Sequence, residues 1–169
     1  MIEIVEADIS TLKVDAIVNA ANSALCGGGG VDGAIHLAAG PQLLDACRML
    51  GSCEPGSAVL TPGFALPARY VIHAVGPVWW GGERGEARLL AQTYESAFRV
   101  ALAQKDIRSI AFPALSTGAY QFPSGLAASI AVQVMRAHES RFQRIVACLF
   151  DPDSTALYWD LLHDEEAAG

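Results

Sequence analysis

The residues best suited to chemistry lie in one short segment, where an amide and a carboxylate flank four glycines. Asn22 precedes the glycines at positions 27–30, and Asp32 follows them. Glycine lets a ligand approach the backbone closely, and a glycine-rich turn between a strand and a helix presents N–H groups to a phosphate. We therefore predict a phosphate-binding loop. The alternative is a flexible surface loop, which needs neither Asn22 nor Asp32.

The spacing of these glycines alone does not name the ligand. Gly28, Gly30 and Gly33 match a dinucleotide-binding fingerprint, and Glu54 lies near the expected distance downstream. In that fold the glycines follow the first strand directly, whereas Glu54 here lies in a predicted turn. No Gly-Lys-Ser/Thr follows the glycines, which argues against a P-loop. A nicotinamide-dependent oxidoreductase stays open as an alternative that only the spacing supports.

A second loop of small residues, 113–123, also follows a predicted strand and precedes a predicted helix. Ser116 and Thr117 could add hydroxyl donors to its backbone N–H groups, or they could only cap the turn. Two such loops at one edge of a sheet could hold a pyrophosphate from both sides.

Two carboxylates carry alternative interpretations. Asp8 follows the first predicted strand, where it could cap a turn or accept a hydrogen bond from an exocyclic amine such as that of adenine. Asp32 could be the N-cap of a helix that begins at Gly33, a role that can coexist with catalysis.

The elements that position these residues alternate along the chain. Apolar patterns predict strands at 2–6, 15–20, 57–61, 70–74, 109–112 and 144–150. They predict helices at 34–50 (broken near Pro41), 86–104, 124–138 and 155–163. This order indicates one layered α/β/α domain over residues 1–169 with a short acidic tail at 164–169. Ligands of such domains bind at the carboxyl ends of the strands, where both loops fall.

The composition indicates a compact globular protein. The 169 residues are 52% apolar and 17% charged, and no apolar run reaches the length of a membrane span. The N-terminal segment carries acids instead of a basic region, so we expect no signal peptide and a cytoplasmic location. The net charge of −7 argues against broad affinity for nucleic acid, although backbone amides can still hold a small anion.

The cysteines and histidines show no metal-binding spacing. There is no CxxC among the four cysteines and no HExxH among the four histidines. We expect reduced thiols, no metal and no cofactor.

Five segments of the sequence, 15–22, 27–40, 66–68, 71–77 and 113–120, together resemble the macrodomain family. More narrowly, they resemble its MacroD-type branch, which removes ADP-ribose-linked esters. The resemblance extends from about Ile2 to Leu162. It implies a three-layer α/β/α fold with a mixed, roughly six-stranded sheet that binds ADP-ribose.

The resemblance also implies how the ligand would lie. Asp8 would bind the adenine amine beside the Ile9 backbone, and Phe150 would pack near the adenine. Asn22 would bond the hydroxyls of the distal ribose, and Tyr120 would lie against that ribose. Gly29 would be a further substrate-binding residue. The pyrophosphate would contact the backbone of Gly30, Val31, Asp32, Leu115, Ser116, Thr117, Gly118 and Ala119.

The implied activity is hydrolysis of an ester on the distal ribose without a metal. Asp32 would be the catalytic carboxylate that orients or deprotonates water, with Asn22 fixing the ribose. The substrate would be O-acetyl-ADP-ribose or ADP-ribose linked to Asp or Glu of a protein, and we expect a monomer. An ADP-ribose reader without turnover is the alternative, and such a reader would not need Asp32.

Two positions depart from the family pattern. Ala7 replaces the usual glycine before Asp8, and it keeps a small residue there. Gln121 replaces the glycine after Tyr120, and a positive φ at this position would cost roughly 1 kcal/mol.

Overall fold

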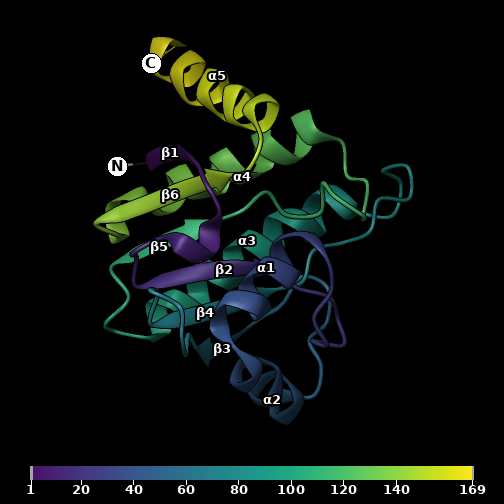
Figure 1. The fold of residues 1–169 in the computed structure, drawn as a ribbon. Helices are drawn as coiled ribbons and strands as arrows, with labels where there is room; N and C mark the ends of the chain where they lie inside the picture. Colours follow the sequence, from purple (N-terminus) through teal and green to yellow (C-terminus); the bar gives the residue numbers. More distant parts are fainter. Residues whose placement is uncertain (1, 169) are drawn as a thin grey trace.

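A computed structural model describes residues 2–168, and its ribbon shows one sheet with helices packed around it (Figure 1). The sheet has the strand order β1-β6-β5-β2-β4-β3. Only β3 and β4 pair antiparallel, so the sheet is mixed. The strands are β1 (Ile2–Glu6), β2 (Ala16–Ala20), β3 (Ala58–Pro62), β4 (Tyr70–Ala74), β5 (Ser109–Phe112) and β6 (Arg144–Leu149).

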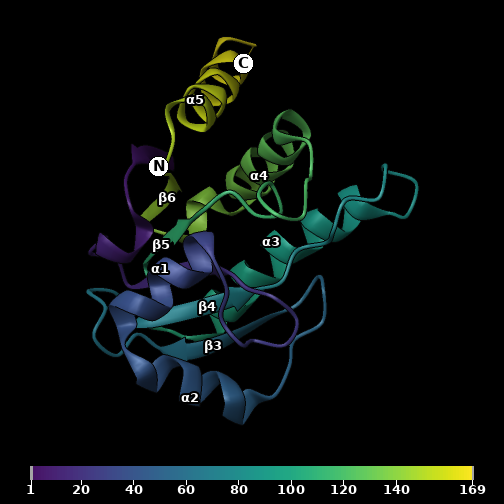
Figure 2. The ribbon, with the colours of Figure 1, turned by 45° about the vertical axis from the view of Figure 1, so that its right-hand side comes forward.

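The helices form one layer on each face of the sheet (Figures 1 and 2). The first two pack on one face and the last three on the other, which gives the predicted three-layer α/β/α fold. Short 3-10 turns lie at Ile9–Thr11 and Glu139–Arg141. The helices are α1 (Gly30–Ala39), α2 (Pro41–Leu50), α3 (Glu86–Ala103), α4 (Ser124–His138) and α5 (Pro152–Ala168).

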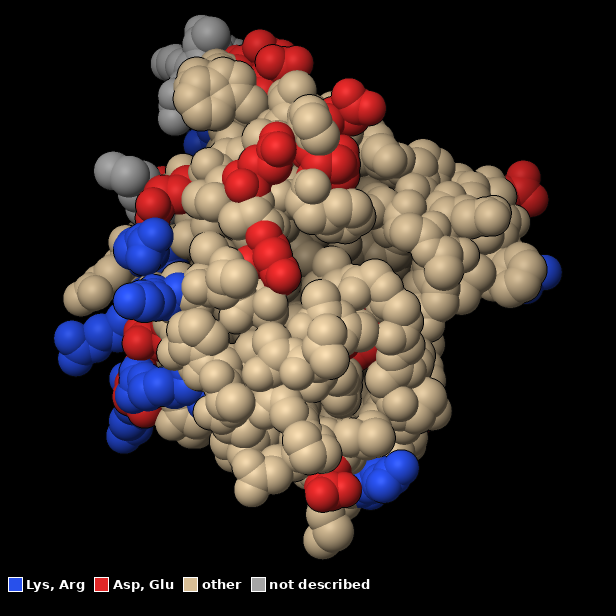
Figure 3. Space-filling model, viewed as in Figure 1, with Lys and Arg blue, Asp and Glu red and all other residues tan. Residues whose placement is uncertain are grey.

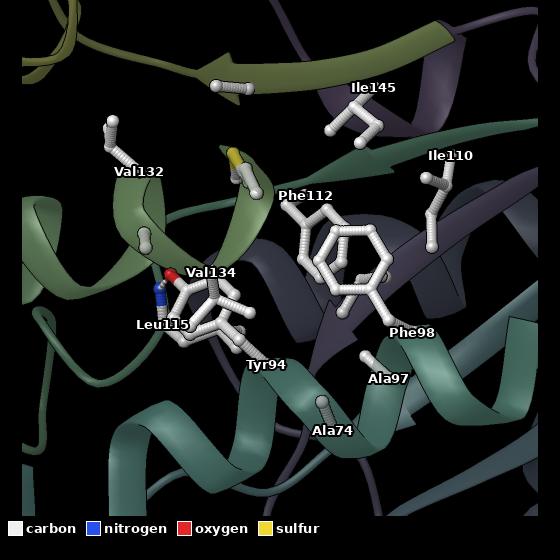
Figure 4. Packing of buried hydrophobic residues seen from close by; sticks show 14 of the residues in the cluster. Ala74, Tyr94, Ala97, Phe98, Ile110, Phe112, Leu115, Val132, Val134 and Ile145 are labelled. Atoms are coloured by element: carbon white, nitrogen blue, oxygen red, sulfur yellow. Dashed lines mark hydrogen bonds between the residues drawn. The ribbon is translucent and has the colours of Figure 1, made fainter. Parts of the chain in front are cut away.

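Alternate residues of the central strands supply the two cores. Ile17 packs with the layer of α1 and α2, whereas its neighbour Val18 packs with α3 and α4. The larger core is aromatic: Phe98 and Phe112 have ring centroids 4.8 Å apart, and Tyr94 lies beside them (Figure 4). A sheet that is apolar on both faces must be covered on both faces, which fixes the layered architecture.

Strand bounds agree with the sequence prediction to within one residue at each end, but two helices differ. Helix α1 begins at Gly30, four residues before the predicted start, because the glycine run supplies its first turn. Helix α5 begins at Pro152, where Asp151 Oδ1 accepts a bond from Ser154 N (2.7 Å), and it continues to Ala168. It thus includes most of the predicted tail, whose last residue, 169, lies outside the described residues.

The parallel strands bring four loops to one edge of the sheet, the carboxyl edge. These are the loops that follow β1, β2, β5 and β6, and they build the site described below. Among residues 2–168, no helix combines the length and the apolar character that crossing a membrane requires.

Candidate active site

Two adjoining cavities lie at the carboxyl edge of the sheet. The cavity between the loops that follow β2 and β5 has a volume of about 580 Å³, and its neighbour at the end of β1 has about 530 Å³. Gly30, Val31 and Phe150 line both cavities, so the two form one continuous site. Every residue to which the sequence assigns a site role lines at least one of them. The structure thus brings these residues together, while their roles stay predictions.

Among residues 2–168, no lysine or arginine lines either cavity. Figure 3 shows that Lys and Arg gather mainly along the left-hand edge of this face of the molecule. An anion in the site would therefore be held by backbone N–H groups and not by cationic side chains.

The first of the two loops, called here the glycine loop (residues 26–33), takes its shape from glycine. Gly27 and Gly30 have φ of +79° and +59°, a region that side chains disfavour. Gly33 packs so closely on the backbone that an added Cβ would lie 2.5 Å from the Gly28 carbonyl oxygen. The N-cap of α1, Gly29, has no capping side chain, so the first N–H groups of the helix are open to a ligand.

Asp32 is the third residue of α1, and only 6% of its surface is exposed. Its Oδ1 accepts a hydrogen bond from Asn19 Nδ2 (2.8 Å) and lies 3.3 Å from His36 Nε2. The interpretation of Asp32 as an N-cap is wrong, because the glycine run extends the helix backwards and Gly29 takes the cap position. The carboxylate is instead fixed by side chains at the floor of the glycine loop.

A buried polar chain continues from Asp32 into the sheet. Asn19 Nδ2 lies 3.1 Å from His73 Nδ1, and His73 Nε2 lies 2.9 Å from Thr61 Oγ1. Burial, with a smaller effect of nearby His36, lowers the pKa of His73 to about 4. A neutral ring accepts the Asn19 bond at Nδ1 and donates to Thr61 from Nε2.

Sequence reasoning missed Asn19, His73 and Thr61 as parts of the site. A usable signal was present, because Asn19 and His73 are polar residues within apolar strands. The structure places them opposite each other in the register of β2 and β4. A polar residue in a strand that is buried on both faces needs a hydrogen-bond partner, and Asn19 and His73 are partners of each other.

The side chain of Asn22 lies near that of Asp32, on the same side of Gly28. A Cβ added to Gly28 would lie 3.8 Å from Asn22 Nδ2 and 3.4 Å from Asp32 Oδ2. Asn22 Nδ2 donates to Gly27 O (3.0 Å), and its Oδ1 accepts from Cys26 N (3.2 Å). Asn22 therefore shapes the glycine loop, while its second amide hydrogen can still meet a ligand.

Asp8 caps the 3-10 turn that follows β1. Its Oδ1 accepts bonds from Ser10 N (2.9 Å) and Ser10 Oγ (2.7 Å), which confirms the capping interpretation. Both contacts use Oδ1, so the second carboxylate oxygen can accept a bond from a ligand in the smaller cavity. Phe150 is 72% exposed at the boundary of the two cavities.

The other loop, called here the second loop (residues 114–122), reaches the left-handed region without glycine. Ser116 and Gln121 have φ of +67° and +60°, so Gln121 does adopt the positive φ on which its expected cost depends. Within the loop, Phe122 N donates to Ser116 O (2.9 Å) and Gln121 N donates to Gly118 O (3.0 Å). Holding two side-chain residues in this region costs of order 1 kcal/mol each, so the surroundings must stabilise the loop.

The surroundings of the second loop provide contacts at both of its ends. Near its start, Leu115 N donates to the buried hydroxyl of Tyr94 (3.2 Å; Figure 4). Near its end, Trp79 N donates to Tyr120 O (2.8 Å), and the Trp79 and Phe122 rings pack with centroids 4.8 Å apart. The loop is thus held from α3 and from the segment before α3.

Comparisons with known proteins agree with this architecture. A family model described as Macro domain matches residues 18–131. A macro domain-containing protein of Ralstonia nicotianae is 58% identical over 158 residues, which cover 94% of this chain and 92% of that protein. A Klebsiella pneumoniae protein named O-acetyl-ADP-ribose deacetylase is 52% identical over 167 residues, which cover 95% of each chain.

A solved structure shows the same fold. It is a mutant of the Oceanobacillus iheyensis macrodomain with ADPR, which has a TM-score of 0.92 and 38% identity to this chain. The match covers 98% of this chain and 94% of the other.

Proposed function

The chain belongs to the macrodomain family, as a MacroD-type member, and from that premise we propose that it binds ADP-ribose and hydrolyses an ester on the distal ribose. The observation that carries this proposal is the placement of Asp32. It is a buried carboxylate at the floor of a loop of backbone N–H donors, and the Asn22 amide lies near it beside Gly28. A site that only binds an anion has no need of a buried carboxylate beside it.

The two cavities suit the parts of ADP-ribose. The adenine would lie in the smaller cavity, with its amine at Asp8, its ring near Phe150 and the Ile9 backbone beside it. The pyrophosphate would lie between the N–H groups of the glycine loop and those of the second loop. The distal ribose would then reach Asn22 and Tyr120 at the far end of the larger cavity.

Asp32 is placed to act on a water molecule. Oδ1 accepts the Asn19 bond and lies beside His36 Nε2, whereas Oδ2 faces Gly28, and Asp32 lines the larger cavity. From there the carboxylate would orient or deprotonate a water, and the backbone N–H groups would stabilise negative charge that develops in the reaction. This mechanism needs no metal ion, since the carboxylate and the backbone donors supply both functions.

The substrates that fit are esters of the distal ribose. Hydrolysis of O-acetyl-ADP-ribose would yield ADP-ribose and acetate, and hydrolysis of an Asp or Glu ester would free a protein from ADP-ribose. The name of the Klebsiella pneumoniae relative supports the first. We extend the proposal to protein esters because the reacting bond is the same.

A product assay tests the proposal. The purified protein is incubated with O-acetyl-ADP-ribose and, separately, with a protein mono-ADP-ribosylated on Glu, and free ADP-ribose is measured by chromatography. We expect the native protein to release free ADP-ribose and the Asp32→Ala control to release none. Tight binding of ADP-ribose by calorimetry without any release would show that the chain is a reader and not a hydrolase.

A further inference from the structure

A buried carboxylate outside the cleft organises the loop before α3. Glu86 is the first residue of α3, yet only 2% of its surface is exposed. Its carboxylate turns back and accepts bonds from three backbone amides, those of Trp80 (2.9 Å), Gly82 (2.8 Å) and Arg84 (2.6 Å). A charge satisfied in this way fixes its donors in one arrangement.

The loop is shaped around this charge. Burial raises the pKa of Glu86, but the backbone donors outweigh burial and lower the pKa to about 2, so the carboxylate stays ionised at neutral pH. Gly81, Gly82 and Gly85 have φ of +104°, +95° and +74°, which lets the backbone wrap the carboxylate. Figures 1 and 2 show the loop projecting beyond the start of α3.

Contacts lead from Glu86 to the second loop through Trp79. A Cβ added to Gly82 would lie 2.9 Å from Cη2 of Trp79, so the anchored backbone packs directly on the indole. The indole packs on Phe122, and Trp79 N donates to Tyr120 O. Trp79 therefore holds both neighbours of Gln121, the residue with the unfavourable positive φ.

We infer that Glu86 is a positioning residue: by anchoring residues 79–85 it sets the position of Tyr120 in the cleft. The part that Tyr120 plays against the distal ribose rests on the proposed function. The coupling between Glu86 and the second loop is a property of the fold and does not depend on it.

Replacement of Glu86 by glutamine should affect the binding of ADP and of ADP-ribose to different extents. Glu86→Gln removes the charge and turns an amide donor toward backbone donors. We expect the affinity for ADP, which lacks the distal ribose, to change less than about twofold, while the affinity for ADP-ribose and the kcat for ester hydrolysis fall about tenfold. The control is Glu83→Gln, an exposed residue of the same loop with the same change of charge, which should alter neither.

A double-mutant cycle shows whether Glu86 acts through Tyr120. If it does, Glu86→Gln should reduce kcat in the native background but have little further effect in a Tyr120→Ala background. Equal losses of ADP and ADP-ribose affinity, or an equal fall of kcat in both backgrounds, would overturn the inference. Gly82→Ala, which displaces the Trp79 indole directly, should give the same selective loss and serves if Glu86→Gln does not fold.

Hydrogen exchange separates this inference from the proposed function. The Trp79 amide should exchange at least about tenfold faster in Glu86→Gln than in the native protein or Glu83→Gln, because its bond to Tyr120 opens more often. Unchanged exchange at Trp79 would overturn the inference whatever the protein hydrolyses. Faster exchange in a protein that releases no ADP-ribose would count against the proposed function alone.

Discussion

The glycine loop and the second loop face the same cleft but reach the left-handed backbone region with different residues. In the glycine loop, Gly27 and Gly30 adopt positive φ without strain. In the second loop, Ser116 and Gln121 adopt it at a cost. The first loop therefore carries its conformation in its own residue types, whereas the second depends on contacts with the rest of the fold.

The supports of the two loops differ in the same way. Beneath the glycine loop lies a polar chain that runs from Asp32 through Asn19 to His73. Around the second loop lie Tyr94 and the Trp79 segment, which hold it at its two ends. A substitution within the glycine loop should therefore alter that loop's conformation directly. The conformation of the second loop should also change when residues that do not line the cleft are substituted.

The largest effect should come from one added methyl group in the glycine loop. Gly33→Ala would place a Cβ 2.5 Å from the backbone oxygen of Gly28, and backbone cannot move aside cheaply. We expect a loss of about 3 kcal/mol in the free energy of unfolding, measured by urea denaturation, together with a loss of ADP-ribose affinity.

Gly29→Ala is the matched control. Its φ of −92° suits alanine, and an added Cβ there meets no atom within 4 Å. The comparison fails if the two variants lose the same stability, because the loop would then be insensitive to close packing at Gly33.

The polar chain beneath the glycine loop should make stability depend on pH. The pKa of His73 is about 4 in the folded protein, against an ordinary value of 6.5. Between these two pH values His73 is protonated in the unfolded chain but neutral in the folded protein. The resulting loss of unfolding free energy is absent above pH 6.5 and grows to about 3 kcal/mol as the pH falls to 4.

The pH dependence of the unfolding free energy can be measured by urea denaturation of the native protein and of His73→Gln at several pH values between 7 and 4. The carboxylates titrate in both proteins, so their effect cancels when the unfolding free energy of one protein is subtracted from that of the other. Parallel stability curves for the two proteins would mean that His73 does not stay neutral in the folded state.

A distant hydroxyl should matter for the second loop. Tyr94→Phe removes the acceptor for Leu115 N and leaves a buried amide unpaired. We expect a loss of about 1–2 kcal/mol in unfolding free energy and faster amide exchange at Leu115. Tyr70→Phe removes an exposed hydroxyl that donates to Asp106, and it should cost less than about 0.5 kcal/mol. Similar losses from the two variants would contradict the support assigned to Tyr94.

The smallest expected effect is a gain in stability from a substitution in the second loop. Gln121→Gly removes a side chain from a backbone with φ of +60°, and the unfolding free energy should rise by roughly 0.5–1 kcal/mol. Gln133→Gly, in an exposed helical position of α4, should lower it by about 1 kcal/mol. Thermal unfolding of both variants checks the sign, and a loss at Gln121 would mean that its side chain stabilises the loop.

The sequence predicted the parts of the fold that local patterns determine. Apolar runs marked all six strands, and glycine content marked the glycine loop, where the side chains of Asn22 and Asp32 meet beside Gly28. The start of α1 was misplaced because glycine has a low helix propensity, yet Gly33 N donates to Gly29 O (3.2 Å) and Gly30 is the first helical residue.

The contacts of the supporting residues could not be predicted, because they depend on strand register and on contacts between distant segments, although Asn19 and His73 stand out in the sequence as polar residues within apolar strands. Asn19 and His73 are 54 positions apart and meet only when β2 pairs with β4. Glu86 and Tyr94 look like ordinary residues of an amphipathic helix in the sequence. Their roles arise from where the helix places them beside the loops.

The central claim is that Asp32 in the glycine loop performs the chemistry while both loops together hold the ligand. Asp32→Asn tests it most directly, because an amide oxygen can still accept the Asn19 bond but the side chain no longer acts as a base. ADP-ribose affinity and release of ADP-ribose from O-acetyl-ADP-ribose should be measured on the same protein.

We predict an ADP-ribose affinity within about threefold of the native value and a rate of release at least about a hundredfold lower. A native rate would remove Asp32 from the mechanism. An equal collapse of affinity and rate would show that Asp32 serves the shape of the loop and not its chemistry.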